Sequence, residues 1–165
     1  MDFGWKTHSA INEWTAKVDS KAAIVLSLGG ILLGFIITLS SSGRALADLQ
    51  GWHMIVGRVG VGLTALGVLL AGFVVTPRLN RRRSKMTWKD NFIYFGHLRH
   101  WKPADLRSEL KALDVGQELD LLATQLVGTA KIAWYKHSLL QFAMASLVFG
   151  VLLVVLSAVW PSSST

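Results

Sequence analysis

The stretch that decides the fold is AAIVLSLGGILLGFIITL, which runs from Ala22 to Leu39 without a charged residue. Wound as a helix, these residues would measure about 27 Å, because each residue of an α-helix rises by about 1.5 Å. That length is close to the roughly 30 Å thickness of a bilayer's hydrocarbon core. The stretch therefore predicts a helix that spans a membrane.

A second apolar stretch, VGVGLTALGVLLAGFVV, runs from Val59 to Val75. The span can begin near Ile55 if the Arg58 side chain reaches back to the lipid headgroups. It should end at Thr76, because the residue before a proline is driven out of helical geometry. We therefore expect the second span over residues 55–76.

A third apolar stretch, LLQFAMASLVFGVLLVVLSAVW, runs from Leu139 to Trp160 and is ended by Pro161. Apolar residues make up 52% of the chain, more than an ordinary soluble domain contains. The predicted fold class is an all-α membrane protein. It would have three transmembrane helices, helical cytosolic extensions and a small cytosolic helical region.

The distribution of Lys and Arg predicts which way the spans point. The link between the first two spans, about residues 40–58, holds only Arg44 and Arg58, whereas residues 76–138 hold twelve Lys and Arg. Cytoplasmic segments carry the excess of these residues. We therefore expect a cytosolic extension 1–21, a span 22–39, an outer loop 40–54, a span 55–76, a basic cytosolic region 77–138, a span 139–160 and an outer tail 161–165.

The helices are predicted to continue outside the spans. Ile11, Trp14 and Val18 recur at steps of three and four residues and lead into Ala22, so we expect one helix from about Ser9 to Leu39.

The cytosolic region should form helices of its own. Pro103 is suited to the first turn of a helix. Asp114 followed by Gln117 is typical of a helix N-terminus, and no proline interrupts residues 115–160. One helix of up to ~46 residues, on the order of 70 Å, could follow. This helix and the N-terminal one would pack together as a juxtamembrane bundle.

The sequence carries no enzyme motif, and we expect no catalytic activity. A Walker loop, a G-x-S-x-G turn and an H-E-x-x-H pair are all absent. The chain has no cysteine, which excludes disulfides and thiolate metal sites. His97 and His100 lie three residues apart, but no third ligand follows at helical spacing, so we expect neither a metal nor a cofactor.

Small residues mark the faces on which the spans could pack. Gly30 and Gly34 form a G-x-x-x-G pair, and Gly62 and Gly67 lie in the second span. Such residues let helix backbones approach closely. The pattern fits packing within one chain and packing between copies.

Three short motifs together carry a family resemblance. They are VDSKAA at Val18–Ala23, NFIYFGHL at Asn91–Leu98, and LATQL at Leu122–Leu126 followed by AKIAWYK at Ala130–Lys136. Their order around three spans resembles the transmembrane effectors of the Pycsar anti-phage system, the PycTM family, over about residues 8 to 160. The sequence reads Ile-Tyr-Phe-Gly-His where that family leads us to expect two phenylalanines before the glycine.

The resemblance implies a function. In such a system a partner cyclase makes cyclic UMP or cyclic CMP on infection, and the effector binds that nucleotide and impairs the bacterial inner membrane. Growth then stops before phage mature. The distribution of Lys and Arg would then place the N-terminus in the cytosol and the C-terminus in the periplasm. We also expect a homo-oligomer, because three helices cannot line a pore. The chain alone leaves open which pyrimidine is bound.

The resemblance also directs attention to candidate ligand residues on the cytosolic side. A single phosphate needs hydrogen-bond donors and positive charge, and a pyrimidine ring stacks on aromatic side chains. Trp88 and Trp101 could contribute to such stacking. The candidates for binding the nucleotide are Asp19, Lys21, Arg81, Arg82, Arg83, Asn91, Tyr94, Phe95, Arg99 and Gln125.

Other functions fit parts of the pattern. Arg81–Arg83 could be only a topology signal that contacts anionic lipid. The chain could be a structural or accessory subunit of a membrane transporter or signalling complex. Its net charge of +7 alone suggests nucleic acid, which we do not expect as a partner.

Overall fold

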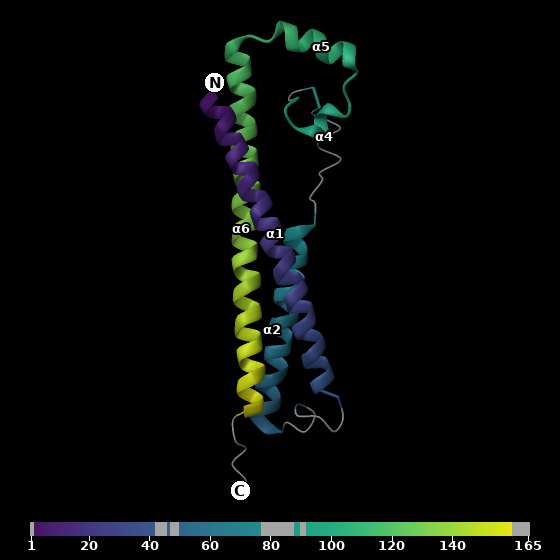
Figure 1. The fold of residues 1–165 in the computed structure, drawn as a ribbon, viewed down its shortest axis with the longest axis vertical. Helices are drawn as coiled ribbons and strands as arrows, with labels where there is room; N and C mark the ends of the chain where they lie inside the picture. The colour runs from purple at the N-terminus through teal and green to yellow at the C-terminus, as the bar shows by residue number, and fades with distance from the viewer. Residues whose placement is uncertain (1, 42–45, 47–49, 77–87, 90–91, 160–165) are drawn as a thin grey trace. The chain divides into compact units, whose positions relative to one another are not determined.

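The computed structural model describes residues 2–41, 46, 50–76, 88–89 and 92–159. This part is 88% helical and contains no strand. Its elements are α1 (Asp2–Leu39), α2 (Gly51–Val75), α4 (Phe95–Leu98), α5 (Pro103–Ala112) and α6 (Val115–Val159), shown in Figure 1. Three of them, α1, α2 and α6, are long and apolar enough to cross a membrane. The predicted fold class is confirmed.

Two helix boundaries follow the local rules that the sequence indicated. Thr76 takes an extended conformation (φ −67°, ψ 125°) and ends α2 before Pro77. At the start of α6, the Gln117 amide donates to Asp114 Oδ1 at 2.8 Å. The Asp114 amide in turn donates to Gln117 Oε1 at 3.1 Å, so the predicted capping box is present.

The start of α1 differs from the prediction, and α2 begins before its predicted span. Helix α1 begins at Asp2 and not near Ser9, with a carboxylate in its first turn and an ion pair of 2.6 Å between Lys6 and Asp2. Both features stabilise a helix N-terminus. Helix α2 begins at Gly51, whose φ of +59° is open to glycine at little cost.

The chain divides into two compact units. The first unit comprises Met1–Ala16 and Pro77–Tyr135, and the second comprises Lys17–Thr76 and Lys136–Thr165. In the first unit the starts of α1 and α6 pack together, as predicted. Leu122 is buried against Gly4, and Trp5 Nε1 donates to Glu118 Oε1 at 3.3 Å.

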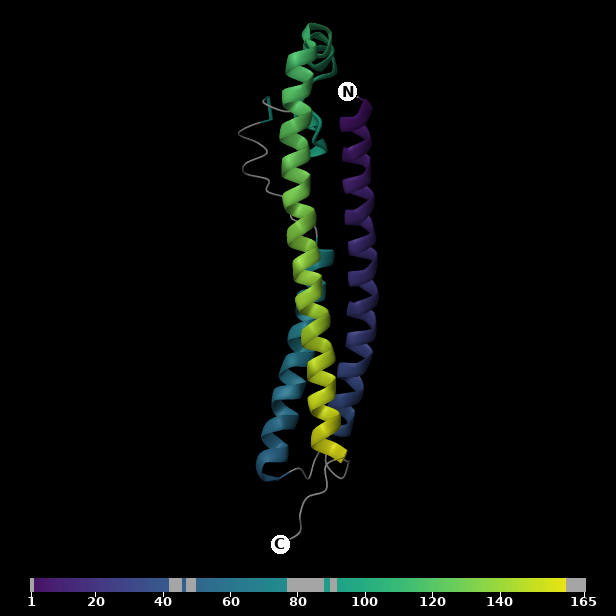
Figure 2. The ribbon, with the colours of Figure 1, turned by 90° about the vertical axis from the view of Figure 1, so that its left-hand side faces the viewer.

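The second unit is a bundle of α1, α2 and α6, visible in Figures 1 and 2. Helices α2 and α6 touch through backbone. A Cβ added at Gly60 would lie 2.8 Å from the Gly150 carbonyl oxygen, and one at Gly67 would lie 2.8 Å from the Ala143 oxygen. Only residues without bulk allow this approach. The fully buried Thr64 satisfies its hydroxyl by donating to the Gly60 oxygen at 2.9 Å.

Three of the four glycines predicted to pack helices face outward in the structure. A Cβ added at Gly30, Gly34 or Gly62 would meet no atom within 4 Å in the described part of the chain. Packing between copies through these three glycines stays a prediction, whereas Gly67 lies in the α2–α6 contact.

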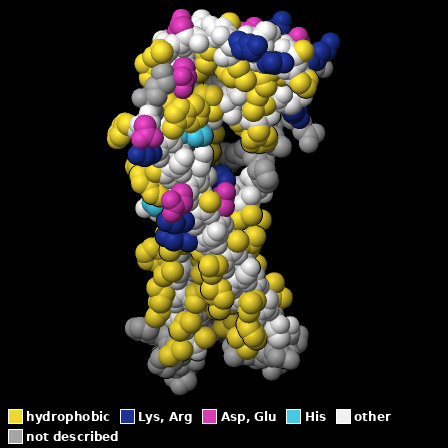
Figure 3. All heavy atoms as spheres, turned by 45° about the horizontal axis from the view of Figure 1, so that its top comes forward, with side chains coloured by type: hydrophobic (Ala, Val, Ile, Leu, Met, Phe, Trp, Pro, Cys, Tyr) yellow, Lys and Arg dark blue, Asp and Glu magenta, His cyan; other side chains and the backbone are white. Residues whose placement is uncertain are grey.

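The outward surface of this bundle is apolar. Figure 3 shows many hydrophobic side chains on the face of the molecule in view. The exposed apolar residues of this unit include Ile24, Phe35, Leu69, Phe142 and Val148. An exposed apolar surface of this extent is typical of a protein that contacts lipid.

Candidate functional site

The first unit contains a turn rich in aromatic side chains, made by described residues 88–89 and 92–101 and called the aromatic turn below. Trp101 Nε1 donates to the Trp88 carbonyl oxygen at 3.1 Å across thirteen residues of chain. The two indole rings meet edge to face, with centroids 4.9 Å apart and planes at 85°. Phe92 meets Trp101 in the same way, at 6.1 Å. These contacts hold the two ends of the turn together.

A second group of rings lies on α4. The Tyr94 ring contacts the rings of Phe95 and His97, with centroids 4.7 Å and 5.3 Å away. Gly96 is buried beneath the Tyr94 ring, and a Cβ at this position would collide with it. The Phe95 side chain remains 65% exposed. An exposed flat ring beside a second ring is a surface on which a nucleobase can stack.

Positive charge lies beside these rings. Lys89 Nζ is 5.5 Å from the centroid of the Trp88 ring, a cation–π distance. Arg99 Nε donates to His100 Nε2 at 3.2 Å, which fixes the base of the guanidinium group. For the Nη groups of Arg99, the described residues supply no hydrogen-bond acceptor. The turn therefore combines donors for an anion with faces for a ring.

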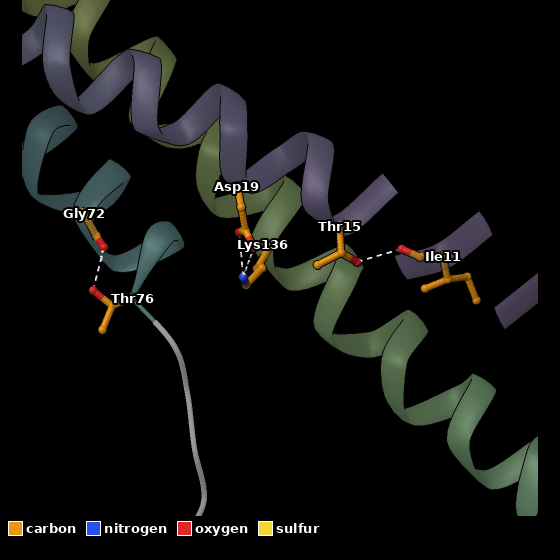
Figure 4. Close-up of polar contacts among 6 residues, drawn as sticks. All are labelled: Ile11, Thr15, Asp19, Gly72, Thr76 and Lys136. Carbon is orange, nitrogen blue, oxygen red and sulfur yellow. Dashed lines mark hydrogen bonds and ion pairs between the residues drawn. The ribbon is translucent and has the colours of Figure 1, made fainter. Parts of the chain in front are cut away.

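A separate polar contact lies in the second unit, between α1 and α6. Lys136 Nζ donates to both Asp19 oxygens, at 2.6 Å and 2.8 Å (Figure 4). The Lys136 side chain is 15% exposed and that of Asp19 is 37% exposed. The pair adjoins the apolar cluster of Val18, Ala22, Val74 and Leu140. A charge in such surroundings needs an opposite charge beside it.

The three apolar helices and the basic, aromatic turn can now be compared with known protein families. The family model of the Pycsar effector protein domain, PycTM, matches residues 3–162. The chain belongs to this family. The match covers nearly the whole chain and confirms the resemblance drawn from the three motifs. No curated protein and no solved structure matches the chain.

Membership in the PycTM family establishes the general role. The chain is a Pycsar effector with a part in anti-phage defence, and it is a membrane protein. The family further implies a cyclic nucleotide signal from a partner cyclase.

The PycTM structure brings together three of the predicted ligand residues, Tyr94, Phe95 and Arg99, in the aromatic turn. Gln125 lies half-buried on α6 in the same unit, and its carbonyl oxygen accepts from Thr129 Oγ1 at 2.9 Å. Four other predicted residues, Arg81, Arg82, Arg83 and Asn91, lie outside the described residues.

Asp19 and Lys21 belong to the second unit of this PycTM protein, whereas the aromatic turn belongs to the first. Asp19 is bound by Lys136, and Lys21 is exposed. Sequence reasoning missed Lys136 as the partner of Asp19. A signal was present, since Lys136 continues the apolar stripe of Leu126, Thr129 and Ala133, where a charge needs a partner.

One groove in the first unit is unsuited to a nucleotide phosphate. It lies between α5 and α6 and is lined by Glu109, Ala112, Leu113, Gln117, Asp120, Leu121 and Thr124. Two carboxylates and no Lys or Arg are among these described residues, so an anion would be repelled. Within the first unit the aromatic turn is the better candidate for the PycTM ligand.

A metal site finds no support in the described part of the chain. It contains no group of three His, Asp or Glu residues that could hold a metal ion.

Proposed function

We propose that this Pycsar effector binds a cyclic pyrimidine mononucleotide, cyclic UMP or cyclic CMP, and that binding impairs the inner membrane. The infected cell then stops growing before phage mature. In this proposal the protein acts by binding alone, without catalysis or a cofactor. The observation that carries it is the presence of the exposed Phe95 ring and of two cations, Lys89 and Arg99, in one short turn of a protein whose family has a cyclic nucleotide as its signal.

The chemistry of the turn fits such a ligand. A cyclic mononucleotide carries one negative charge and one flat base. Phe95, with Tyr94 at 4.7 Å, offers a stacking surface. Arg99 offers donors in a planar fork that suits phosphate oxygens. The predicted wall of Arg81–Arg83 would add charge to the same segment of the sequence.

Two helices provide a route from ligand to membrane. Helices α1 and α6 are continuous, and each contributes residues to both units. A ligand shifts an equilibrium only when it binds one state more tightly than the other. We propose that the nucleotide favours one arrangement of the first unit, and that α1 and α6 transmit this preference to the spans.

The membrane effect requires more than one copy. Three helices cannot line a pore, so we propose a symmetric homo-oligomer that packs through the outward glycines of α1 and α2. In this proposal the N-terminus and residues 77–138 are cytosolic, and the C-terminal tail is periplasmic.

Titration of the purified full chain tests the ligand. Cyclic UMP, cyclic CMP, cyclic AMP and cyclic GMP are each added to detergent-solubilised protein, and binding is followed by calorimetry and tryptophan fluorescence. We expect saturable binding of at least one cyclic pyrimidine and much weaker binding of both purines. If the protein keeps its helical circular dichroism but binds neither pyrimidine, the proposal fails.

A further inference from the structure

A single cation interrupts the apolar surface of α2. Arg58 is the only Lys or Arg in the 25 residues of this helix, and its side chain is exposed. In the described part of the chain, Arg58 makes neither an ion pair nor a hydrogen bond from its side chain. A guanidinium group within a membrane-spanning segment is costly unless a partner reaches it.

A cavity lies beside this arginine, within the second unit. It is lined by Ser40, Leu46, Met54, Gly57, Arg58, Val61 and Val154. Ser40 directly follows α1, Leu46 lies between α1 and α2, and the other lining residues come from α2 and α6. Gly57 contributes no side chain, so space remains next to Arg58. The lining of the cavity therefore includes a cation and a hydroxyl together with leucine, methionine and valine side chains.

Neighbouring residues indicate that this end of α2 lies near the membrane surface. The exposed Trp52 ring contacts the His53 ring at a centroid distance of 3.9 Å. Tryptophan is enriched where a span meets the headgroups. His53 is buried, and its Nδ1 finds no hydrogen-bond partner in the described structure. Arg58 and the Nδ1 atom of His53, for which the described residues supply no partner, therefore both lie within the first eight residues of α2.

We propose that this cavity binds the phosphate of a phospholipid headgroup, with Arg58 as the cation that holds it. One acyl chain would then lie along Val61 and Val154. The combination of a cation with apolar walls favours a lipid over a free anion, because a free anion gains nothing from the walls. Arginine matches the geometry of phosphate oxygens, and it keeps its charge in apolar surroundings.

The lipid site is distinct from the proposed nucleotide site. All residues that line the cavity belong to the second unit, whereas the aromatic turn belongs to the first. The inference therefore does not depend on the identity of the nucleotide, and either proposal can fail without the other.

Native mass spectrometry of the full chain, extracted in mild detergent, tests the site. We expect the unaltered protein and R58K to retain phospholipid, and R58Q to retain about tenfold less, since it loses a charge-assisted hydrogen bond. The control K131Q removes an exposed cation of α6 from the first unit and should retain lipid normally. Equal retention by R58Q, or an equal loss in K131Q, would overturn the proposal.

Two further measurements keep the test decisive. The V61F variant fills the cavity and leaves Arg58 in place. We expect it to retain less lipid than the unaltered protein. Normal retention would show that the lipid does not occupy the cavity. Delipidated protein is also heated with phosphatidylglycerol vesicles or with inorganic phosphate. We expect the vesicles alone to raise the melting temperature. An equal rise with inorganic phosphate would assign the site to a free anion and overturn the lipid proposal.

Discussion

We predict that removing one partner of the Asp19–Lys136 ion pair destabilises the protein more than removing the other. Asp19→Asn leaves the Lys136 ammonium without its counter-ion, and that side chain is only 15% exposed. Lys136→Met leaves the Asp19 carboxylate alone, but that group is 37% exposed and water can solvate it. The two single substitutions remove the same interaction and should nevertheless have different costs.

The magnitudes follow from burial. Breaking a fully buried pair costs about 3–5 kcal/mol, and exposed pairs are worth about 0.2–1 kcal/mol. We expect Asp19→Asn to lower the free energy of unfolding by about 2–3 kcal/mol, because its orphaned charge is the more buried. Lys136→Met should cost only about 1–2 kcal/mol, because solvent screens the remaining charge.

A double-mutant cycle in mixed detergent micelles measures both costs, with helix loss followed by circular dichroism as the denaturing detergent fraction rises. The double variant should cost less than the sum of the singles by about 1–2 kcal/mol, as is typical of side chains in direct contact. Additive costs would show that the two residues are not coupled. A larger cost for Lys136→Met than for Asp19→Asn would refute the reasoning from burial.

Three other predictions concern ligand, assembly and topology. Arg99→Glu should weaken binding of the cyclic pyrimidine about ten- to hundredfold through loss of a charged hydrogen bond. The matched variant Arg107→Glu on α5 should bind normally in the same titration, and equal effects would remove Arg99 from the site. Gly30→Leu or Gly34→Leu should reduce the detergent-extracted oligomer to smaller species on size-exclusion chromatography. Helix content should not fall, because a Cβ at either position meets no described atom of the same chain. An unchanged size with full toxicity would show that these glycines are not the contact between copies. A reporter fused after Thr165 should give a periplasmic signal, and a cytoplasmic signal would mean that one span does not cross.

Local chemistry explains what could be predicted about the helices. The Asp114–Gln117 capping box and the extended Thr76 before Pro77 each depend on residues within a few positions, so sequence alone suffices. The start of α1 escaped prediction because the apolar stripe weakens before Ile11. The helix is supported there by contacts such as the hydrogen bond from Trp5 to Glu118, which lies 113 residues away in the sequence.

The candidate site was predictable only in part, for a similar reason. The motif Asn91–Leu98 indicated Tyr94 and Phe95, and the positive charge next to it indicated Arg99. The closure of the turn by Trp101 on Trp88 depends on edge-to-face geometry, which has no periodic signature. Lys136 reaches Asp19 across 117 residues, and no local rule pairs two such positions.

The contact between α2 and α6 bears on how the spans could move. At Gly60 and Gly150 the two helices meet backbone to backbone, with only the Thr64 hydroxyl and a Val154 methyl beside them, so few side-chain atoms can move there to absorb a small slide. Packed helices shift by about 1–2 Å or, more drastically, by a whole turn of about 5.4 Å. Helix α1 is different, since near Gly29 it meets its neighbours through the side-chain tips of Leu147 and Val68. The α2–α6 contact therefore has less freedom to slide than the contacts of α1, and we expect α1 to be the helix that moves when the spans rearrange.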